Sequence, residues 1–194
     1  MDPFNYGNKT KETIAKGDEI TLTKGTITES FTVLSNSNEK ITAIPKYNIT
    51  LTENYPVQSS TAETIEFSTR PYWSRDEIDK ETPGWNSGAV NNVVDINMDN
   101  EANKIQKYII AYKTSLEDMG VEGVEVRAAK YSDLSVTGIT NDMRNPGKTG
   151  IFWLGSCSSA NYSCPILLDN TGNFINNYYY GNSSGVRPII IIDK

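Results

Sequence analysis

The chain has 194 residues, with 18 Lys and Arg against 24 Asp and Glu, so its formal net charge at pH 7 is -6. This length suits one domain with a sizeable core. An acidic chain without a block of basic residues argues against nucleic acid or an anionic membrane as the main partner. The chain has no histidine, which removes the commonest general base and metal ligand. We therefore expect a protein that is not an enzyme and uses no cofactor or metal.

The first 17 residues are polar and end at Gly17. Their start, Met1-Asp-Pro-Phe4, looks like one added to a shortened chain, so we expect residues 1–17 to be a tag remnant and an N-terminal linker. A signal peptide or prepilin leader would then have been removed, and the protein would meet a membrane only through that segment. Residues 18–194 are expected to form a single domain.

A β-hairpin is predicted over residues 18–34. Residues 18–23 alternate between polar and apolar, Lys24-Gly25 supplies a turn, and residues 26–34 alternate again. A period of two residues is typical of a strand with one face in water. A further strand is predicted at residues 40–44.

From about residue 45 to residue 97 the apolar residues follow no sustained period of 2 or 3.6. A connection this long without structure is unusual in a compact domain. We therefore expect an ordered but irregular insertion, a middle layer whose large aromatic residues anchor it in the core. These residues are Phe67, Tyr72, Trp73 and Trp85.

One long helix is predicted over about residues 99–119. Apolar residues recur there at steps of three and four, Asp99 or Asn100 can cap the start, and Gly120 ends the helix. A short strand at residues 124–128 and a short second helix at residues 131–135 follow. Residues 140–150 are expected to form a loop.

The start of this helix has an alternative interpretation as a calcium loop. Oxygen-bearing side chains alternate over residues 95–101, as in the first half of such a loop. However, Asn100 stands where that loop needs Gly, and Gln106 stands where it needs a bidentate Glu. The same residues can instead cap the helix.

The C-terminal segment is predicted to form a small antiparallel sheet. Strands are expected at residues 151–154, 165–168 and 173–180, and the last strand contains four consecutive isoleucines, Ile189 to Ile192. A strand this apolar is expected to lie in the middle of a sheet, with earlier strands on both sides. The fold class expected from these elements is α+β, with small antiparallel sheets.

The two cysteines, Cys157 and Cys164, lie close together in a polar loop. We expect them to form a disulfide, which would fix the shape of the loop and indicate an extracellular or cell-surface protein. The alternative is a pair of reduced thiols. Two cysteines alone do not make a structural zinc site.

Between these strands the sequence is rich in Asn, Ser and Tyr, the residues that build adaptable binding surfaces. We expect a ligand-binding surface here. Its candidate residues are Ser159, Asn161, Tyr162, Asn176, Tyr178, Tyr180 and Asn182. The alternative is structural, because Asn and Ser also fill turns and alternate tyrosines can face the core.

The same segment carries a resemblance to a known family. Its motifs are Phe152-Trp-Leu-Gly-Ser156, Asp169-Asn-Thr-Gly172, Asn176-Asn-Tyr-Tyr179 and Gly185-Val-Arg-Pro188 followed by the isoleucines. Their order resembles the C-terminal signature of C-type-lectin-like domains in bacterial surface and phage-associated proteins. The resemblance implies that Trp153 and the Gly-Val-Arg-Pro segment pack the sheet, and that the residues between them form a display surface.

Upstream motifs in the order of uncharacterised clostridial-type surface and prepilin-type proteins extend the resemblance over most of residues 17–192. They include Lys46-Tyr-Asn48, Gln58-Ser-Ser60, Phe67-Ser-Thr69 and Tyr72-Trp-Ser74. The calcium motifs of the lectins, Glu-Pro-Asn, Gln-Pro-Asp and Trp-Asn-Asp, are absent from the sequence. Calcium-dependent sugar binding is therefore not implied.

These observations lead to three hypotheses about function. The first is a non-enzymatic extracytoplasmic module for recognition or adhesion, such as a minor pilin or adhesin, with a surface glycan or a protein receptor as its partner. The second is a structural subunit of a pilus or phage-type surface assembly, which contacts neighbouring subunits and has no ligand of its own. The third is a glycan-active enzyme that uses two carboxylates, which only the fold could bring together.

Overall fold

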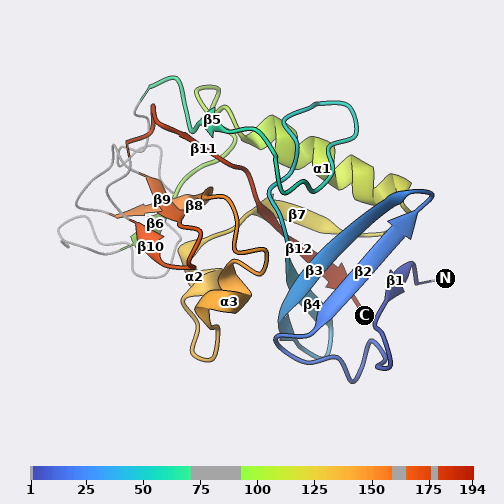
Figure 1. The fold of residues 1–194 in the computed structure, drawn as a ribbon. Helices are drawn as coiled ribbons and strands as arrows, with labels where there is room; N and C mark the ends of the chain where they lie inside the picture. Colours follow the sequence, from blue (N-terminus) through green and yellow to red (C-terminus); the bar gives the residue numbers. More distant parts are fainter. Residues whose placement is uncertain (1, 71–92, 159–164, 176–178) are drawn as a thin grey trace.

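The computed structural model of the chain describes residues 2–70, 93–158, 165–175 and 179–194. Of these residues, 37% lie in strands and 13% in helices. Figure 1 shows a large sheet on one side of the molecule, a smaller sheet on the other, and short helices beside them.

The large sheet has six strands, and every neighbouring pair in it is antiparallel. Its spatial order is β1-β2-β3-β4-β12-β7. The strands are β1 (Phe4–Asn5), β2 (Glu19–Lys24), β3 (Ile27–Asn36), β4 (Lys40–Pro45), β12 (Pro188–Asp193) and β7 (Glu125–Ala128). The hairpin and the strands predicted at residues 40–44 and 124–128 are confirmed.

The last strand, β12, lies inside this sheet between β4 and β7. Ile190 and Ile192 belong to one cluster of buried apolar residues, and Ile189 belongs to a second. Because side chains alternate across a strand, the isoleucines contribute to the core on both faces of the sheet. The predicted central position of the final strand is confirmed.

The remaining strands form two smaller sheets. One has four strands in the order β10-β9-β8-β6, and the other pairs β11 with β5. These strands are β10 (Phe174–Ile175), β9 (Pro165–Leu168), β8 (Phe152–Ser158), β6 (Val93–Asp95), β11 (Ser183–Ser184) and β5 (Ile65–Glu66). All of β8 is buried, so the predicted strand over 151–154 is longer than expected and runs through the core.

The described helices are α1 (Gln106–Asp118), α2 (Tyr131–Leu134) and α3 (Asn141–Arg144). The α1 helix packs against β7 and buries Ile109, Tyr112 and Leu116 in the first core cluster. The α2 helix confirms the short helix predicted at 131–135, and Leu134 joins the second cluster. The α3 helix lies in the segment predicted to be a loop.

The fold class predicted from the sequence is wrong. An α+β, C-type-lectin-like domain with one long helix at about 99–119 was expected, but the described chain is mostly antiparallel sheet and its helices are short. The α1 helix has 13 residues and begins at Gln106, about two turns later than predicted. Strand pairing therefore dominates this fold.

Asparagine side chains explain the late start of α1. The Oδ1 atom of Asn100 accepts a hydrogen bond from the backbone N–H of Ala102 at 2.9 Å. The Oδ1 atom of Asn103 accepts bonds from the N–H groups of Ile105 and Gln106, both at 2.8 Å. Such local bonds compete with helix formation and favour turns and helix starts. The N-cap residue is Ile105, and the side chain that bonds the N–H groups at the start of the helix is that of Asn103 rather than of Asp99 or Asn100.

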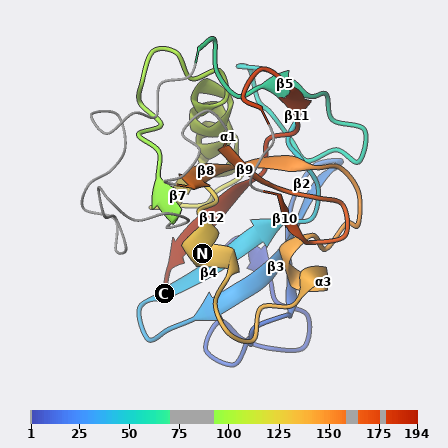
Figure 2. The ribbon, with the colours of Figure 1, turned by 90° about the vertical axis from the view of Figure 1, so that its left-hand side faces the viewer.

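The segment expected to be a linker contributes to the fold. Phe4 pairs with Leu22 in the sheet, and Phe4 and Ile14 are both buried in the first core cluster. The two ends of the described chain lie close together in Figures 1 and 2. The large sheet therefore includes residues on the N-terminal side of the predicted domain boundary.

The described part of the predicted irregular insertion is anchored by Phe67. Its ring meets the Trp153 ring edge-on, with 5.5 Å between centroids, and the Trp153 Nε1 group donates to the Ile65 carbonyl at 2.9 Å. The predicted burial of Phe67 is confirmed. Tyr72, Trp73 and Trp85 lie outside the described residues.

Candidate functional site

The predicted ligand-binding surface is described only in part. Tyr180 and Asn182 belong to the described residues, and both lie just before β11. The other five candidates, Ser159, Asn161, Tyr162, Asn176 and Tyr178, lie outside the described residues, as does Cys164. The site is therefore built from residues 179–183 and their neighbours.

Two tyrosines form the centre of this region. The rings of Tyr179 and Tyr180 lie 4.2 Å apart between centroids at an angle of 43°, and their hydroxyl groups are hydrogen bonded at 2.8 Å. Tyr179 is 48% exposed, whereas Tyr180 is partly buried against the first core cluster. One ring is thus anchored in the protein and holds the other at the surface.

The backbone around these rings is tied to the neighbouring segment. The Phe67 N–H donates to the Tyr180 carbonyl at 2.9 Å, and the Asn182 N–H donates to the Tyr179 carbonyl at 3.0 Å. In β11, Ser183 lies opposite Glu66 of β5. Because the backbone is fixed on both sides of Tyr180, the aromatic pair is presented in one orientation.

An ion pair lies beside the rings. Glu66 of β5 contacts the Lys104 ammonium, and the carboxylate is close enough to Tyr180 to affect its hydroxyl electrostatically. We call Tyr179, Tyr180, Asn182, Glu66 and Lys104 the tyrosine surface. It combines aromatic rings with an amide and one charge of each sign, a combination suited to polar and stacking contacts.

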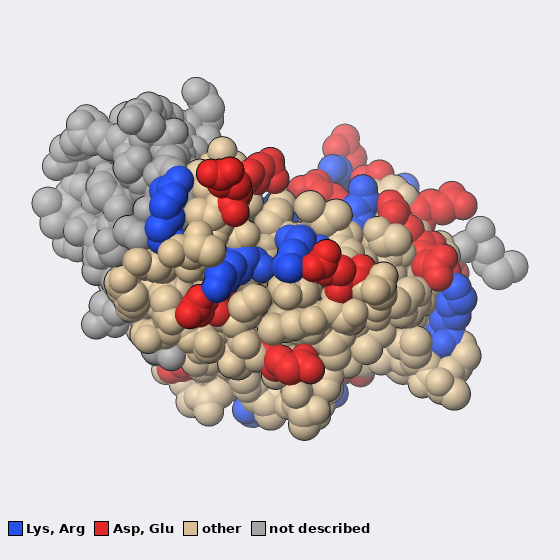
Figure 3. Space-filling view, turned by 90° about the horizontal axis from the view of Figure 1, so that it is seen from above, with Lys and Arg blue, Asp and Glu red and all other residues tan. Residues whose placement is uncertain are grey.

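Charges of both signs are mixed over the face seen from above in Figure 3. Lys and Arg side chains lie next to Asp and Glu side chains, so this face offers no large field of a single sign among the described residues. Exposed ion pairs occur among the described residues, including Lys107 with Glu53 and Lys113 with Glu117. Long-range electrostatic attraction therefore gives this face little preference for a charged partner.

A buried arginine holds the chain just after the tyrosine surface. Arg187 is 1% exposed, and its Nε group donates to Asn48 Oδ1 at 3.0 Å. Its other two nitrogens donate to Asn145 Oδ1 at 2.7 Å and to the Thr149 carbonyl at 2.9 Å. We call these four residues the arginine clamp, because they join the end of the chain to two distant loops.

The charge of Arg187 has an unusual environment. Its guanidinium lies 4.6 Å from the centroid of the Phe152 ring, and no carboxylate in the described part of the chain forms an ion pair with it. Burial lowers the pKa of Arg187 to about 9, so the group is still a cation at pH 7. Neutral oxygens and an aromatic face thus solvate the charge.

Asp95, the first residue of the alternative calcium loop, takes part in a buried polar network. Its carboxylate accepts a hydrogen bond from the Ser156 hydroxyl at 3.0 Å and contacts the Lys130 ammonium at 2.8 Å. The Ser156 oxygen also accepts from the Tyr131 N–H at 3.0 Å. Within the described ranges, no group of three or more Cys, Asp or Glu side chains is arranged to hold a metal ion.

Cys157 is buried in β8 and forms no disulfide with another described residue. In its reduced form, burial, with a smaller effect of Asp95, raises the pKa of the thiol to about 12, so the thiol is protonated at neutral pH. Its expected partner, Cys164, is not among the described residues, and the disulfide stays a prediction.

Glu29 in β3 of the large sheet is another buried ionisable group. Glu29 accepts a hydrogen bond from the Tyr112 hydroxyl at 2.5 Å and another from the Gln58 N–H at 2.9 Å. Burial raises the pKa of Glu29, and the hydrogen bonds from Tyr112 and Gln58 act in the opposite direction. The groups that donate to this carboxylate, the Tyr112 hydroxyl and the Gln58 N–H, are neutral.

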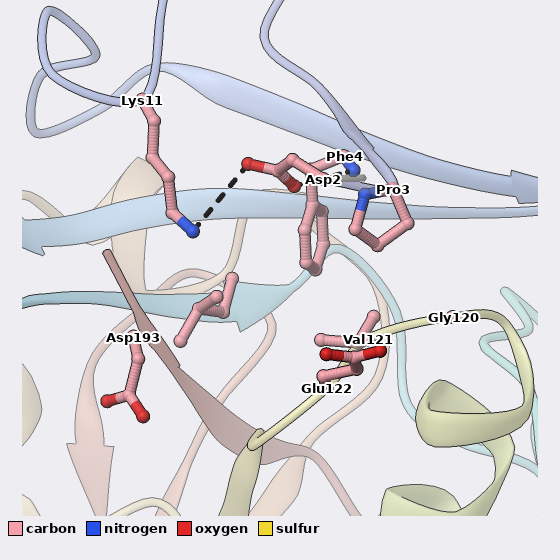
Figure 4. Close-up of a pocket in the computed structure, with 9 residues that line it drawn as sticks. Asp2, Pro3, Phe4, Lys11, Gly120, Val121, Glu122 and Asp193 are labelled. Atoms are coloured by element: carbon pink, nitrogen blue, oxygen red, sulfur yellow. Dashed lines mark hydrogen bonds and ion pairs between the residues drawn. The ribbon is translucent and has the colours of Figure 1, made fainter.

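A pocket of about 220 Å³ lies where the two ends of the described chain meet. Figure 4 shows Asp2, Glu122 and Asp193 around it, with Asp2 pointing toward Lys11. Asp2 lies 3.6 Å from the Lys11 ammonium, and Asp193 lies 4.0 Å from that of Lys40. Two of the three carboxylates thus face a lysine rather than each other, which is not the arrangement that glycoside hydrolysis needs.

Sequence reasoning found part of this site. It selected Tyr180 and Asn182 from the run of Tyr and Asn, and it placed the Gly-Val-Arg-Pro segment in the packed part of the protein. It placed Tyr179 in the same run but did not select it among the seven candidates, and it missed Glu66 and Lys104. No sequence signal indicates these two, because only the pairing of β5 with β11 brings them beside the rings.

The chain matches no protein-family model, and no curated protein or solved structure gives a significant match. The resemblance to bacterial surface proteins therefore stays a prediction. No helix in the described part of the chain is long and apolar enough to cross a membrane.

Proposed function

We propose that this chain is a non-enzymatic recognition module of a bacterial cell surface, and that it binds a surface glycan or protein receptor through the tyrosine surface. The observation that carries the proposal is the fixed, exposed tyrosine pair. An aromatic ring that is half exposed contributes less to stability than a fully buried one, and aromatic rings with an exposed face often serve as anchors of binding surfaces.

The way the tyrosine pair is held supports this proposal. Tyr180 packs against the core and its carbonyl is bonded to Phe67, so little conformational freedom is lost when a partner covers Tyr179. A binding surface that is already ordered avoids part of the entropic cost of association. The adjacent amide and ion pair add hydrogen-bonding groups for specificity.

The proposal is tested by binding of the labelled protein to an array of immobilised glycans and extracellular surface proteins. We expect the double variant Tyr179→Ala/Tyr180→Ala to bind at least about 30-fold more weakly, because aromatic anchors contribute about 2 kcal/mol or more. Val136→Ala is the matched control. Val136 is 52% exposed and lies between α2 and α3, at the other end of the molecule from β5 and β11 in Figure 1.

Equal binding of the double variant and the wild type would contradict the proposal. A wild-type protein that binds nothing on the array but self-associates in sedimentation velocity, with the double variant monomeric, would also overturn it. That second result would favour the alternative, a structural subunit of a surface assembly.

A further inference from the structure

A second hollow lies beside β3, apart from the residues of the tyrosine surface. Its volume is about 310 Å³, and we call it the hydroxyl notch. It is lined by Thr28, Ser30, Tyr47, Gln58, Ser59 and Ser60. Tyr47 and the segment from Gln58 to Ser60 belong to two of the upstream motifs singled out in the sequence, and the fold brings them together here.

The notch exists because the large sheet loses a strand at this point. β4 pairs with β3 only from Phe31 onward, opposite Pro45. The next residue, Lys46, donates its N–H to the Ser30 carbonyl at 2.8 Å, and the chain then leaves the sheet. It returns at Gln58, so the first part of β3 forms one wall and residues 58–60 form the other.

The floor of the notch is rigid. The Gln58 Oε1 atom accepts hydrogen bonds from the N–H groups of Lys46 at 3.0 Å and Tyr47 at 3.3 Å. Its amide nitrogen donates to the Tyr112 hydroxyl at 3.3 Å, and its backbone N–H donates to Glu29. The polar atoms of the Gln58 side chain are thus all used to hold the loop, so the shape of the notch exists before any ligand binds.

The aromatic wall is also fixed. A Cβ atom added at Gly147 would lie only 2.7 Å from Cδ1 of Tyr47 and 2.8 Å from Cε1. The edge of the Tyr47 ring therefore rests against the glycine backbone, and the half-buried ring cannot swing in that direction. Tyr47 lines the notch, and the Lys46 ammonium lies 6.0 Å from the centroid of its ring.

Three hydroxyl groups in the notch have no hydrogen-bond partner within the described ranges: those of Ser30, Tyr47 and Ser60. The others are engaged, since Thr28 bonds to Thr23 and Ser59 bonds to Thr61. None of the six lining side chains carries a charge, and the nearest buried group, Glu29, is a carboxylate bonded to the floor. The chemistry of the notch thus favours a neutral ligand with many hydroxyl groups.

We propose that the hydroxyl notch binds a single neutral sugar ring. Serine and tyrosine hydroxyls both donate and accept hydrogen bonds, as the hydroxyls of a sugar do, and a rigid aromatic ring can pack against the C–H groups of a pyranose. The volume lies at the lower end of the range for small-molecule pockets, which fits one ring rather than an oligosaccharide. This site is independent of the tyrosine surface and supplies a second point of attachment.

The test is nitrogen-15 NMR titration of the full chain with glucose, galactose and N-acetylglucosamine, each to about 50 mM, since a single ring in a shallow site is expected to bind in the millimolar range. We expect saturable shifts of the amides of Thr28, Ser30 and Ser59 with at least one of these sugars. Ser30→Ala/Ser60→Ala should weaken binding at least about tenfold, the effect of losing about 1.4 kcal/mol of hydrogen bonding.

Two control variants show whether an effect is specific to the hydroxyl notch and independent of the tyrosine surface. Ser132→Ala removes an exposed hydroxyl on α2 and should bind as the wild type does. Tyr179→Ala/Tyr180→Ala should also leave the titration unchanged, so that failure at one site is distinguishable from failure at the other.

Several outcomes would overturn the proposal. These are the absence of saturable shifts with all three sugars, an unchanged affinity of Ser30→Ala/Ser60→Ala, and equal binding of glucuronate and glucose. Shifts caused by the extended peptide Thr-Val-Thr-Val-Thr and by none of the sugars would show instead that the open edge of β3 accepts a peptide strand.

Discussion

Residues 179–183 and residues 185–187 are separated by one buried serine, yet their surroundings are opposite. Tyr179, Asn182 and Ser183 are exposed, and the first group is held mainly by backbone hydrogen bonds to the segment around β5. The second group is buried completely, and Arg187 is bonded through its side chain to Asn48, Asn145 and Thr149. Over a few residues the chain changes from a surface to a core element.

This difference teaches that the buried residues which hold the fold and the exposed residues proposed to bind a partner are separate within the same segment. The arginine clamp fixes where β12 begins, and through it the position of β11. The tyrosine surface can therefore vary in its side chains without loss of the fold. If residues 185–187 hold the fold and residues 179–183 do not, the loss of stability caused by a substitution should decrease steeply from residue 187 to residue 179.

The largest effect is expected for Arg187→Met. The substitution leaves the buried side-chain oxygens of Asn48 and Asn145 without this donor, and the carbonyl of the exposed Thr149 as well. An unsatisfied buried acceptor costs on the order of 1–3 kcal/mol. Since the loss of a buried charge offsets part of this, we expect the free energy of unfolding to fall by about 3 kcal/mol, measured by urea denaturation.

Arg187→Lys is the informative companion of this variant. Lysine keeps the charge but lacks the planar fork that reaches three oxygens in different directions. We expect it to be destabilised nearly as much as Arg187→Met. A lysine variant within about 0.5 kcal/mol of the wild type would show that charge alone, and not the geometry of the clamp, holds this end of the chain.

Alanine substitutions at Gly185 and Gly181 form a matched pair that tests the same division. Their effects on stability are expected to be smaller than that of Arg187→Met. A Cβ at Gly185 would overlap the Asn48 side-chain amide and lie 2.8 Å from the Ile151 carbonyl, whereas at Gly181 it would meet only the Tyr179 ring, at 3.1 Å. Because overpacking in a buried site costs about 1–3 kcal/mol, Gly185→Ala should destabilise by that amount in urea denaturation. Gly181→Ala should cost less, since its only close contact is at 3.1 Å, with one half-exposed side chain, and a shift of a few tenths of an ångström relieves it.

Similar losses for the two alanine variants would contradict the division between surface and core. A larger loss for Gly181→Ala would mean that the region around Tyr179 is packed as tightly as the clamp.

The sequence predicts the local strands of this protein better than its architecture. The hairpin at 18–34 and the strand of isoleucines follow from periodicity and composition, which depend on neighbouring residues. The start of α1 depends on which asparagine captures the free N–H groups, and Asn103 does so instead of Asp99 or Asn100. The helix boundary is set by competition between helical backbone hydrogen bonds and bonds from asparagine side chains to the backbone. The spacing of apolar residues carries no information about this competition.

The candidate site also depends on contacts that local sequence does not predict, here between residues far apart along the chain. The run of Asn and Tyr indicated a surface, and Tyr180 and Asn182 were selected from it. The partners that position the surface come from elsewhere, since Asn48 lies 139 residues from Arg187 along the chain and Asn145 lies 42 residues away. The hydroxyl notch likewise depends on β4 ending at Pro45 and on Gly147 lying against Tyr47. None of these contacts is encoded in a local motif.

The smallest effect on stability is expected for Tyr179→Ala. Its ring is about half exposed and contacts chiefly its neighbour Tyr180, so the change should cost no more than about 0.5 kcal/mol in urea denaturation. Tyr180→Ala should cost more, about 1 kcal/mol, because Tyr180 packs against the first core cluster. A loss above about 1.5 kcal/mol for Tyr179→Ala, half the effect at Arg187, would make the ring pair a structural element. The argument for a recognition surface would then fail even if binding were also lost, because unfolding alone would explain that loss.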